Sequence, residues 1–273
     1  MRQRKIKNLD EKLGSLSYLT VDDGAALKGK WRSVFPEQGS HSDITEPEHG
    51  GAEDAAPGRQ SSSEDTECAG RPLFAEFGCG KGKFIASMAS LHPDREYIAF
   101  EGNQSVVWHA MQKADAQKLD NVKFCPHYID LVGDLFDDGE LDGVYLNFSD
   151  PWPKSKHEKR RLTAGSRLSG YIRAVRQGGT IEFRTDNDDL FDYTMDRIMM
   201  ESGIRIVAVT RDLHGEMEQV AGRRDLTELT DAGYDDDVLD ELDTMADLRV
   251  SSEYEDKFSD TGKCINYVRL KVI

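Results

Sequence analysis

Short apolar runs, rich in aromatic and β-branched residues, alternate with longer stretches of helical periodicity over much of the chain. Such runs are typical of buried strands. We expect seven strands, at residues 73–77 (LFAEF), 97–101 (YIAFE), 122–125 (VKFC), 143–148 (GVYLNF), 180–185 (TIEFRT), 204–210 (IRIVAVT) and 264–273 (CINYVRLKVI). The stretches between them predict helices, at residues 83–91, 105–119, 167–177 and 189–202, with only a short turn near residues 130–136.

Five strand-and-helix units closed by two further strands predict an α/β fold with a doubly wound, mostly parallel seven-stranded sheet. Ligands of such sheets bind in the crevice at the carboxyl ends of the strands. The residues that follow each predicted strand are therefore the first candidates for a site. Trp108, Met111, Met199 and Met200 occupy helix positions that we expect to pack into the core.

Two acidic segments interrupt this pattern. Residues 37–70 are rich in Gly, Pro, Ser and acidic residues and almost lack large apolar ones, which predicts a disordered linker. In residues 215–249, Leu, Val and Met recur at loosely helical spacing, which favours one or two surface helices. We thus expect a basic N-terminal segment at 1–36, the linker at 37–70, and one domain at 71–273 that carries the insertion 215–249.

The charge of the chain is unevenly distributed. The formal net charge is −16, which argues against a nucleic-acid partner only if it is spread evenly. Nine acidic residues against one arginine give residues 37–70 a net charge of −8, and twelve against three basic residues give 215–249 a net charge of −9. The remaining residues sum to +1. The body of the protein is therefore electrically balanced and compatible with an RNA partner.

Cysteine usage and hydropathy restrict the class of protein further. Cys68, Cys79, Cys125 and Cys264 are far apart and form no CxxC pair, which argues against a zinc site and against a disulfide framework. No apolar run reaches about 18 residues, and the basic start has no apolar stretch behind it. We expect a cytoplasmic protein with reduced thiols, no metal and no membrane partner.

The glycine-rich segment EFGCGKG joins the first predicted strand to the first predicted helix. Gly78, Gly80 and Gly82 allow a tight turn and close approach of a ligand to the helix start. A dinucleotide fingerprint, GxGxxG, requires its third glycine at position 83, where the chain has Lys83. An acid at Glu76 and another at Glu101, suited to ribose hydroxyls, favour S-adenosylmethionine over a nicotinamide cofactor. A plain strand-to-helix turn is the alternative.

The fourth predicted strand runs into LNFSDPWPKSKHEKRRLT, in which an aspartate precedes a stiff Pro-Trp-Pro turn and a basic run. Asp150 lies at the strand end, beside the expected crevice. The run has a local charge of +4 and suits RNA phosphates, with contacts expected from Lys156, Lys159, Arg160 and Arg161. Alone, such a run is more often just a solvated surface, and its place beside Asp150 is what favours phosphate contact.

These residues closely resemble the signature of the bacterial tRNA (guanine-N7-)-methyltransferases. Further segments follow in the order of that family: KGKWRSVF (28–35), EFGCGKGKFI, FEGNQS, FRTDNDDLF (183–191), DLHGE (212–216) and SEYEDKF (252–258). The resemblance implies a Rossmann-like, class I S-adenosylmethionine-dependent methyltransferase. The implied reaction is methyl transfer to N7 of a guanine in the tRNA variable loop, guanine 46 in the family, giving 7-methylguanosine.

The resemblance also implies roles for particular residues. It assigns catalysis to Asp150, and cofactor contacts to Glu76, Gly78, Gly80, Gly82, Glu101, Asp130 and Asp150. Substrate contacts fall on Lys154, Asp186, Ser252, Glu253, Tyr254 and Glu255. The chain departs from the family where Ser252 replaces threonine, and where Tyr128 replaces the acid that contacts the adenine end of the cofactor. Asp130, two residues further on, matches a second acid.

Guanine N7 carries a lone pair and no proton, so the expected role of Asp150 and Asp186 is to orient the base and stabilise the methylated cation. Three alternatives stay open: a methyltransferase acting on a non-RNA substrate, a tRNA-binding protein that has lost catalysis, and a nicotinamide dehydrogenase. The sequence leaves open whether the protein is a monomer or a homodimer.

Overall fold

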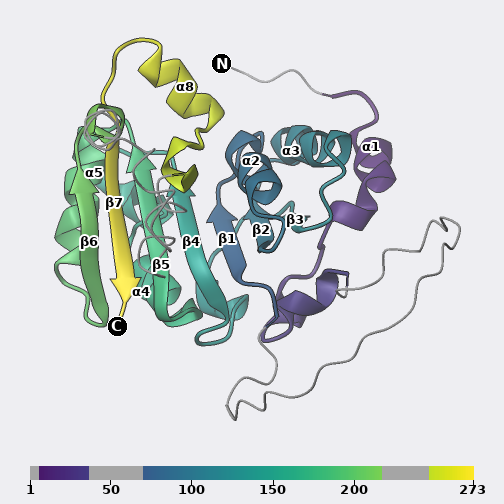
Figure 1. Cartoon of the computed structure of the whole chain (residues 1–273), viewed down its shortest axis with the longest axis horizontal. Coiled ribbons are helices and arrows are strands. Elements are labelled where there is room, and N and C mark those ends of the chain that lie inside the picture. Colours follow the sequence, from purple (N-terminus) through teal and green to yellow (C-terminus); the bar gives the residue numbers. More distant parts are fainter. Residues whose placement is uncertain (1–5, 37–69, 217–245) are drawn as a thin grey trace, which may run out of the picture.

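The computed structural model describes residues 6–36, 70–216 and 246–273, and these build one seven-stranded sheet flanked by helices (Figure 1). The strand order is β3-β2-β1-β4-β5-β7-β6. The strands are β1 Leu73–Phe77, β2 Glu96–Phe100, β3 Val122–Cys125, β4 Leu141–Asn147, β5 Val175–Thr185, β6 Ile204–Thr210 and β7 Asn266–Val272. The first five pair in parallel, and β7 is antiparallel to both β5 and β6.

Two helical layers cover the sheet (Figure 1). Among the described residues the helices are α1 Leu9–Ser15, α2 Lys83–Leu91, α3 Gln104–Ala116, α4 Gly165–Ala174, α5 Asp188–Ile198 and α8 Glu253–Ser259. The short 3₁₀ turns are η1 Ser17–Leu19, η2 Ala25–Leu27, η3 Trp31–Val34, η4 Val132–Asp134 and η5 Ser155–Arg160. The buried cluster on one face includes residues of α4 and α5, and the cluster on the other includes residues of α2 and α3. None of the helices within the described ranges is long and apolar enough to cross a bilayer.

Because side chains alternate along a strand, each strand contributes residues to both faces of the sheet. In β1, Leu73, Ala75 and Phe77 belong to the cluster with α4 and α5, whereas Phe74 packs against the cluster on the other side. Glu76 faces the same side as Phe74 and is 1% exposed. A carboxylate is almost never fully buried unless it has a partner.

The predicted fold is confirmed, and two of its details are wrong. The expected helix at 167–177 ends at Ala174, because Val175 already pairs with Leu141 of β4 and starts the longest strand. Met199 and Met200 lie outside the core and are 75% and 74% exposed, since α5 ends at Ile198. The predicted linker and insertion fall almost entirely on residues 37–69 and 217–245, outside the described part of the chain.

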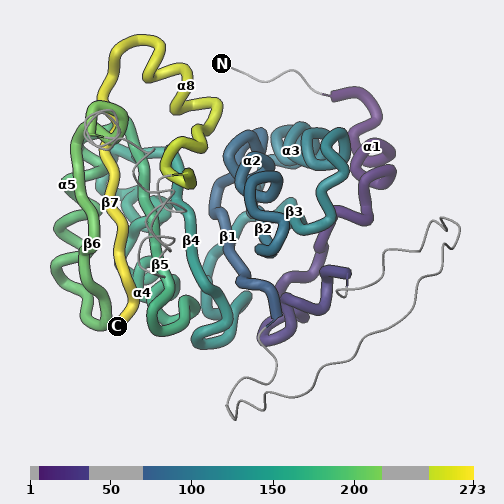
Figure 2. Tube along the Cα trace, viewed as in Figure 1, coloured from purple at the N-terminus to yellow at the C-terminus, as the bar shows by residue number. Residues whose placement is uncertain are grey.

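The N-terminal segment runs along the β3 side of the molecule, shown in purple in Figure 2. Thr20 bridges to Phe124 of β3, which extends the sheet by one contact. Trp31 is fully buried, stacks on Phe136 at 5.3 Å between ring centroids, and donates its indole N–H to the carbonyl of Leu135 at 2.7 Å. This segment therefore contributes to the core of the domain.

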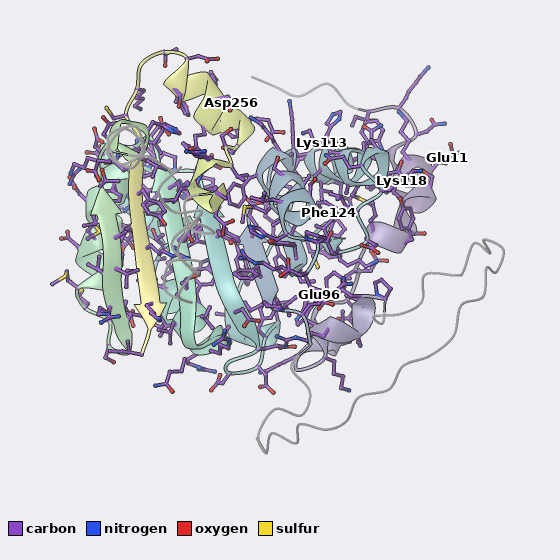
Figure 3. All side chains as sticks on the ribbon, viewed as in Figure 1. Glu11, Glu96, Lys113, Lys118, Phe124 and Asp256 are labelled. Carbon is purple, nitrogen blue, oxygen red and sulfur yellow. The ribbon has the colours of Figure 1, made fainter. Side chains whose placement is uncertain are left out.

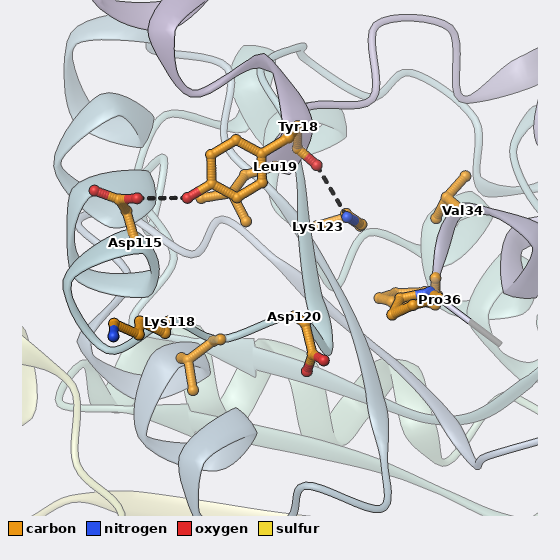
Figure 4. Close-up of a pocket in the computed structure, with 10 residues that line it drawn as sticks. Tyr18, Leu19, Val34, Pro36, Asp115, Lys118, Asp120 and Lys123 are labelled. Carbon is orange, nitrogen blue, oxygen red and sulfur yellow. Dashed lines mark hydrogen bonds between the residues drawn. The ribbon is translucent and has the colours of Figure 1, made fainter. Parts of the chain in front are cut away.

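A pocket of about 590 Å³ lies where this segment meets α3 and the start of β3 (Figure 4). The phenol of Tyr18 donates to Asp115 at 2.5 Å, and the ammonium of Lys123 donates to the carbonyl of Tyr18 at 2.9 Å. The pocket is at the amino end of β3, so it is separate from the crevice expected at the carboxyl ends.

Replacing Trp31 by alanine tests whether the N-terminal segment stabilises the domain. We expect Trp31→Ala to lower the free energy of unfolding by about 3–5 kcal/mol, because it removes a fully buried ring and leaves a cavity. Tyr18→Ala, at a side chain that is 56% exposed, should cost about 1 kcal/mol or less. Urea denaturation followed by circular dichroism measures both, and equal losses would contradict this role of Trp31.

Candidate active site

The carboxyl ends of β1, β2, β4 and β5 bring the predicted residues to one edge of the sheet. Glu76, Glu101, Asp150 and Asp186 come from four different strand ends. Figure 3 shows Asp256 of α8 and Lys113 of α3 towards this edge, with Glu96, at the start of β2, near the opposite end. The sequence-based expectation that the site lies after the strands therefore matches the geometry.

Glu76 is a fully buried acid at this edge. Asn147, at the end of β4, donates its amide N–H to Glu76 Oε1 at 2.9 Å. The other oxygen, Oε2, is buried and has no hydrogen-bond partner among the described residues. Burial raises the pKa of Glu76 to about 8, and the negative charges of Glu253 and Glu101 add to the rise. A cationic amino group placed at Oε2 would satisfy this orphaned oxygen and favour the ionised carboxylate.

The glycine loop has the conformation that its sequence predicts. Gly78, Gly80 and Gly82 have φ values of 84°, 56° and 76°, in the left-handed region. A side chain on Gly82 would place its Cβ 2.4 Å from the Cβ of Ala110, so this glycine also lets α2 pack against α3. Around Gly80, no heavy atom of the described residues lies within 4 Å of a Cβ position, which leaves the loop open towards a ligand.

Glu101 follows β2 and closes the other side of the loop. Its carboxylate accepts the backbone N–H of Gly80 at 3.2 Å and that of Asn103 at 2.8 Å. Burial raises the pKa of Glu101, the two backbone donors oppose the rise, and the charge of Asp150 adds to it. Glu101 and Asp150 therefore lie close enough to sense each other's charge across the crevice.

Tyr128 occupies the loop after β3, where the family has an acid. Its side chain is 82% exposed. The ring lies against Gly102, because a Cβ added at Gly102 would be 2.3 Å from two ring carbons. Asp130 follows two residues later and is also exposed. The glycine after Glu101 thus makes room for an aromatic ring.

Asp150 lies in a turn whose backbone is unusually constrained. Phe148 and Trp152 both have positive φ, 49° and 42°, which is uncommon for bulky residues. Pro151 and Pro153 restrict φ on both sides of Trp152. Arg161 donates to the carbonyls of Pro151 at 3.0 Å and Trp152 at 3.2 Å, and these hydrogen bonds hold the turn in its conformation.

The basic run divides into two groups. Arg160 stacks on Trp152 at 4.8 Å and Arg161 on Tyr193 at 4.1 Å, so both guanidinium groups pack on the protein's own rings. Lys154, Lys156 and Lys159 are exposed along η5. The three lysines and Arg160 are exposed on this face, whereas Arg161 is half-buried.

The segment expected to contact the substrate forms the start of α8. Ser252 caps this helix by accepting the N–H of Glu255 at 3.1 Å. Glu253 accepts from the ammonium of Lys113 at 2.5 Å, and Tyr254 is 55% exposed. Glu255 is 1% exposed and lies against Arg184. Asp186, after β5, pairs with Lys263 at 2.7 Å.

Several residues of the site are absent from the sequence-based prediction. Asn147, Lys83, Lys113, Arg184 and His214 all contact a predicted site residue or its segment. For Asn147 and Arg184 a signal existed, because both are polar residues at strand positions that alternation places inside. Lys83 and Lys113 contact residues about 140 to 173 positions away, which no local pattern reveals.

Comparisons with known proteins agree with this geometry. A family model described as a putative methyltransferase matches residues 70–267. The tRNA (guanine-N(7)-)-methyltransferase of Lactococcus lactis subsp. cremoris strain MG1363 is 33% identical over 273 residues, which cover 100% of this chain and 99% of that protein. The protein of the same name from Bacillus subtilis strain 168 is 36% identical over 214 residues, covering 78% of this chain and 85% of that protein.

The matched residues include the glycine loop, both acids that flank it, and the strained turn at Asp150. The resemblance inferred from the sequence motifs is thereby confirmed. With a seven-stranded, mostly parallel sheet, a family model that matches most of the chain and relatives at this level of identity and coverage, the chain belongs to the tRNA (guanine-N7-)-methyltransferase family.

Proposed function

We propose that this protein transfers a methyl group from S-adenosylmethionine to N7 of a guanine in the tRNA variable loop, guanine 46 in the family. The product is a tRNA that contains 7-methylguanosine. The observation that carries the proposal is the gathering of Glu76, Glu101 and Asp150 around an open glycine loop, directly beside exposed lysines. Family membership supports the same reaction.

The residues of the crevice fit the cofactor. The orphaned Oε2 of Glu76 suits an ammonium group, and the backbone of the glycine loop suits a carboxylate close to the start of α2. Glu101 is placed for two ribose hydroxyls. When bound there, S-adenosylmethionine supplies a methyl group on a sulfonium centre. The surrounding carboxylates favour that positive charge.

The reaction requires alignment more than proton transfer, since guanine N7 has no proton to lose. Asp150 can accept hydrogen bonds from N1–H and N2–H₂ of the base and so fix its angle. The stiff turn holds this carboxylate in place at the edge of the crevice. As N7 gains a bond the purine becomes cationic, and Asp150 together with Asp186 stabilises that charge.

The exposed lysines provide the contact with RNA. Lys154, Lys156 and Lys159 follow Asp150 within nine residues, so phosphates near the target base meet them when the base enters the crevice. Arg160 and Arg161 continue the same run, with their guanidinium groups stacked on Trp152 and Tyr193. tRNA is thus the proposed partner.

Replacing Asp150 by asparagine tests the catalytic role. We expect Asp150→Asn to lower kcat by about 10²–10³-fold at saturating tRNA and cofactor, because it removes a fixed negative charge at the developing cation. Transfer of labelled methyl to tRNA, with the modified nucleotide mapped, measures the effect. Asp138→Asn, in the exposed pair with Arg173, is the matched control and should keep normal turnover. Near-normal kcat in Asp150→Asn would contradict the proposal.

The lysine surface predicts a change in salt dependence. Replacing Lys156 and Lys159 together by alanine should reduce the slope of log affinity against log salt by about 1.4–1.8, because each phosphate contact adds about 0.7–0.9 to the slope. Fluorescence anisotropy of labelled tRNA between low and moderate salt measures it. Lys30→Ala combined with Lys271→Ala, two exposed lysines away from the crevice, is the control. The same slope in both double variants would contradict the assignment.

For the adenine end of the cofactor, we propose that the ring of Tyr128 stacks on the base in place of the acid of the family. Tyr128→Ala should then weaken binding of S-adenosylhomocysteine by about tenfold, since one aromatic face on a nucleobase is worth about 1–3 kcal/mol. Tyr128→Phe keeps the ring and should bind within about twofold of the unsubstituted protein.

A cofactor product with hypoxanthine in place of adenine separates stacking from recognition of the amino group. Stacking predicts similar affinity for both ligands, and Tyr128→Asp should restore a preference for adenine. Calorimetric titration gives the affinities, with Tyr18→Ala as the control for loss of an exposed tyrosine. Unchanged affinity in Tyr128→Ala would show that Tyr128 makes no contact with the base.

A further inference from the structure

The segment at residues 246–259, which we call the strap, lies across the sheet and is bound to it by one buried arginine. Arg184, near the end of β5, is 1% exposed. Its guanidinium donates to the carbonyl of Val250 at 2.7 Å and to that of Asp247 at 3.3 Å. It also donates to Glu255 Oε2 at 3.3 Å. Three contacts from a single strand residue thus reach three positions of the strap.

Glu255 is enclosed as completely as Arg184. Its side chain is 1% exposed, and its second oxygen, Oε1, lies 3.1 Å from Nε2 of His214. The two partners come from different elements, β5 and the helical residues 213–216 that follow β6. One oxygen of the carboxylate thus accepts from Arg184, the other lies close to the imidazole of His214, and a side chain that is 1% exposed leaves almost no surface for a substrate.

The energetics of this pair make the position of the strap definite. A buried carboxylate that loses its partner is strongly disfavoured, because its charge stays desolvated without compensation. The strap cannot shift so as to separate Glu255 from Arg184 without this penalty. The contact with the side chain of Glu255, and then its negative charge, raise the pKa of His214.

The outer side of the strap contacts the glycine loop. Glu253 accepts the backbone N–H of Lys83, the first residue of α2, at 3.4 Å, and the ammonium of Lys113 on α3 at 2.5 Å. The ammonium of Lys83 pairs with Asp256 and donates to the hydroxyl of Ser251 at 2.9 Å. Residues 251–256 therefore contact the end of the glycine loop on one side and β5 on the other.

We propose that Arg184 and Glu255 are positioning residues, whose buried ion pair holds the strap so that Ser252, Glu253 and Tyr254 face the crevice beside the glycine loop. Glu255 does not contact the guanine itself. This role differs from the substrate contact that family resemblance implies for Glu255. The proposal rests on the proposed function only for the substrate that Ser252, Glu253 and Tyr254 would face. The placement of the strap is a property of the protein alone.

Hydrogen–deuterium exchange tests this placement without any substrate. Arg184→Met keeps the bulk of the side chain and removes its charge, and should speed exchange of the amides of residues 252–259 by about tenfold or more. Amides of β2, residues 96–100, should stay protected. Arg184→Lys, which restores a cation, should recover part of the protection. Unchanged exchange in the strap of Arg184→Met would overturn the proposal.

A double-mutant cycle on kcat/KM for tRNA then separates positioning from direct contact. Arg184→Met and Glu255→Met should each lower kcat/KM by about tenfold or more, and the double variant should be no worse than the poorer single variant, because both remove the same pair. If Glu255 contacts guanine independently, the two fold-losses will multiply. Multiplying losses would overturn the proposal.

Arg176→Met is the matched control. Arg176 lies at the other end of β5 and pairs with Asp142 at 2.5 Å, so this variant loses an arginine and an ion pair of the same strand away from the strap. It should leave exchange at residues 252–259 and kcat/KM within about twofold of the unsubstituted protein. Absence of tRNA methylation by the unsubstituted protein would contradict the proposed function, while the exchange experiment would still decide the role of Arg184.

Discussion

The parallel pairing of β1 with β4 places Phe74 opposite Gly143 and Glu76 opposite Tyr145. It depends on Gly143, because a Cβ there would lie 2.7 Å from ring carbons of Phe74, which stacks between Tyr97 and Tyr145 at 5.8 Å from each. With this register, Asn147 reaches Glu76, and the chain leaves β4 directly beside the glycine loop. The cofactor acids and the aspartate of the fourth strand share one edge because these two strands are neighbours.

The two faces of the sheet differ in chemistry, and this difference locates the site. The face under α4 and α5 is apolar, with side chains such as Phe183 and Leu146. On the other face, register aligns Glu76, Tyr145, Glu182 and Arg269 in one row, and Asn147, Arg184, Tyr267 and Thr210 in the next. Such a face is stable only when its groups are paired. Tyr267 donates to Glu182 at 3.1 Å, and the strap supplies partners for Arg184.

The sequence predicts the strands, the crevice and the glycine loop, because these depend on periodicity and on conformations that few residues besides glycine adopt. It does not predict the contacts of a residue whose neighbours are far away in the sequence. Glu255 matches a substrate-contacting position, yet its burial depends on Arg184 and His214, 71 and 41 residues earlier in the chain. The stacking of Arg160 on Trp152 and of Arg161 on Tyr193 likewise cannot be predicted from the basic run alone. The end of the helix before β5 fails for a simpler reason: Val175 has a strand partner that a local window does not contain.

The positive φ values at Phe148 and Trp152 lower the stability of the short turn that holds Asp150. Each costs of order 1–3 kcal/mol relative to an ordinary backbone conformation, and the rest of the fold must offset that cost. Glycine at either position would relieve this backbone cost, but would also remove a ring contact and free the carboxylate of Asp150 to sample other orientations. The fixed orientation of Asp150 therefore comes at the expense of local backbone energy.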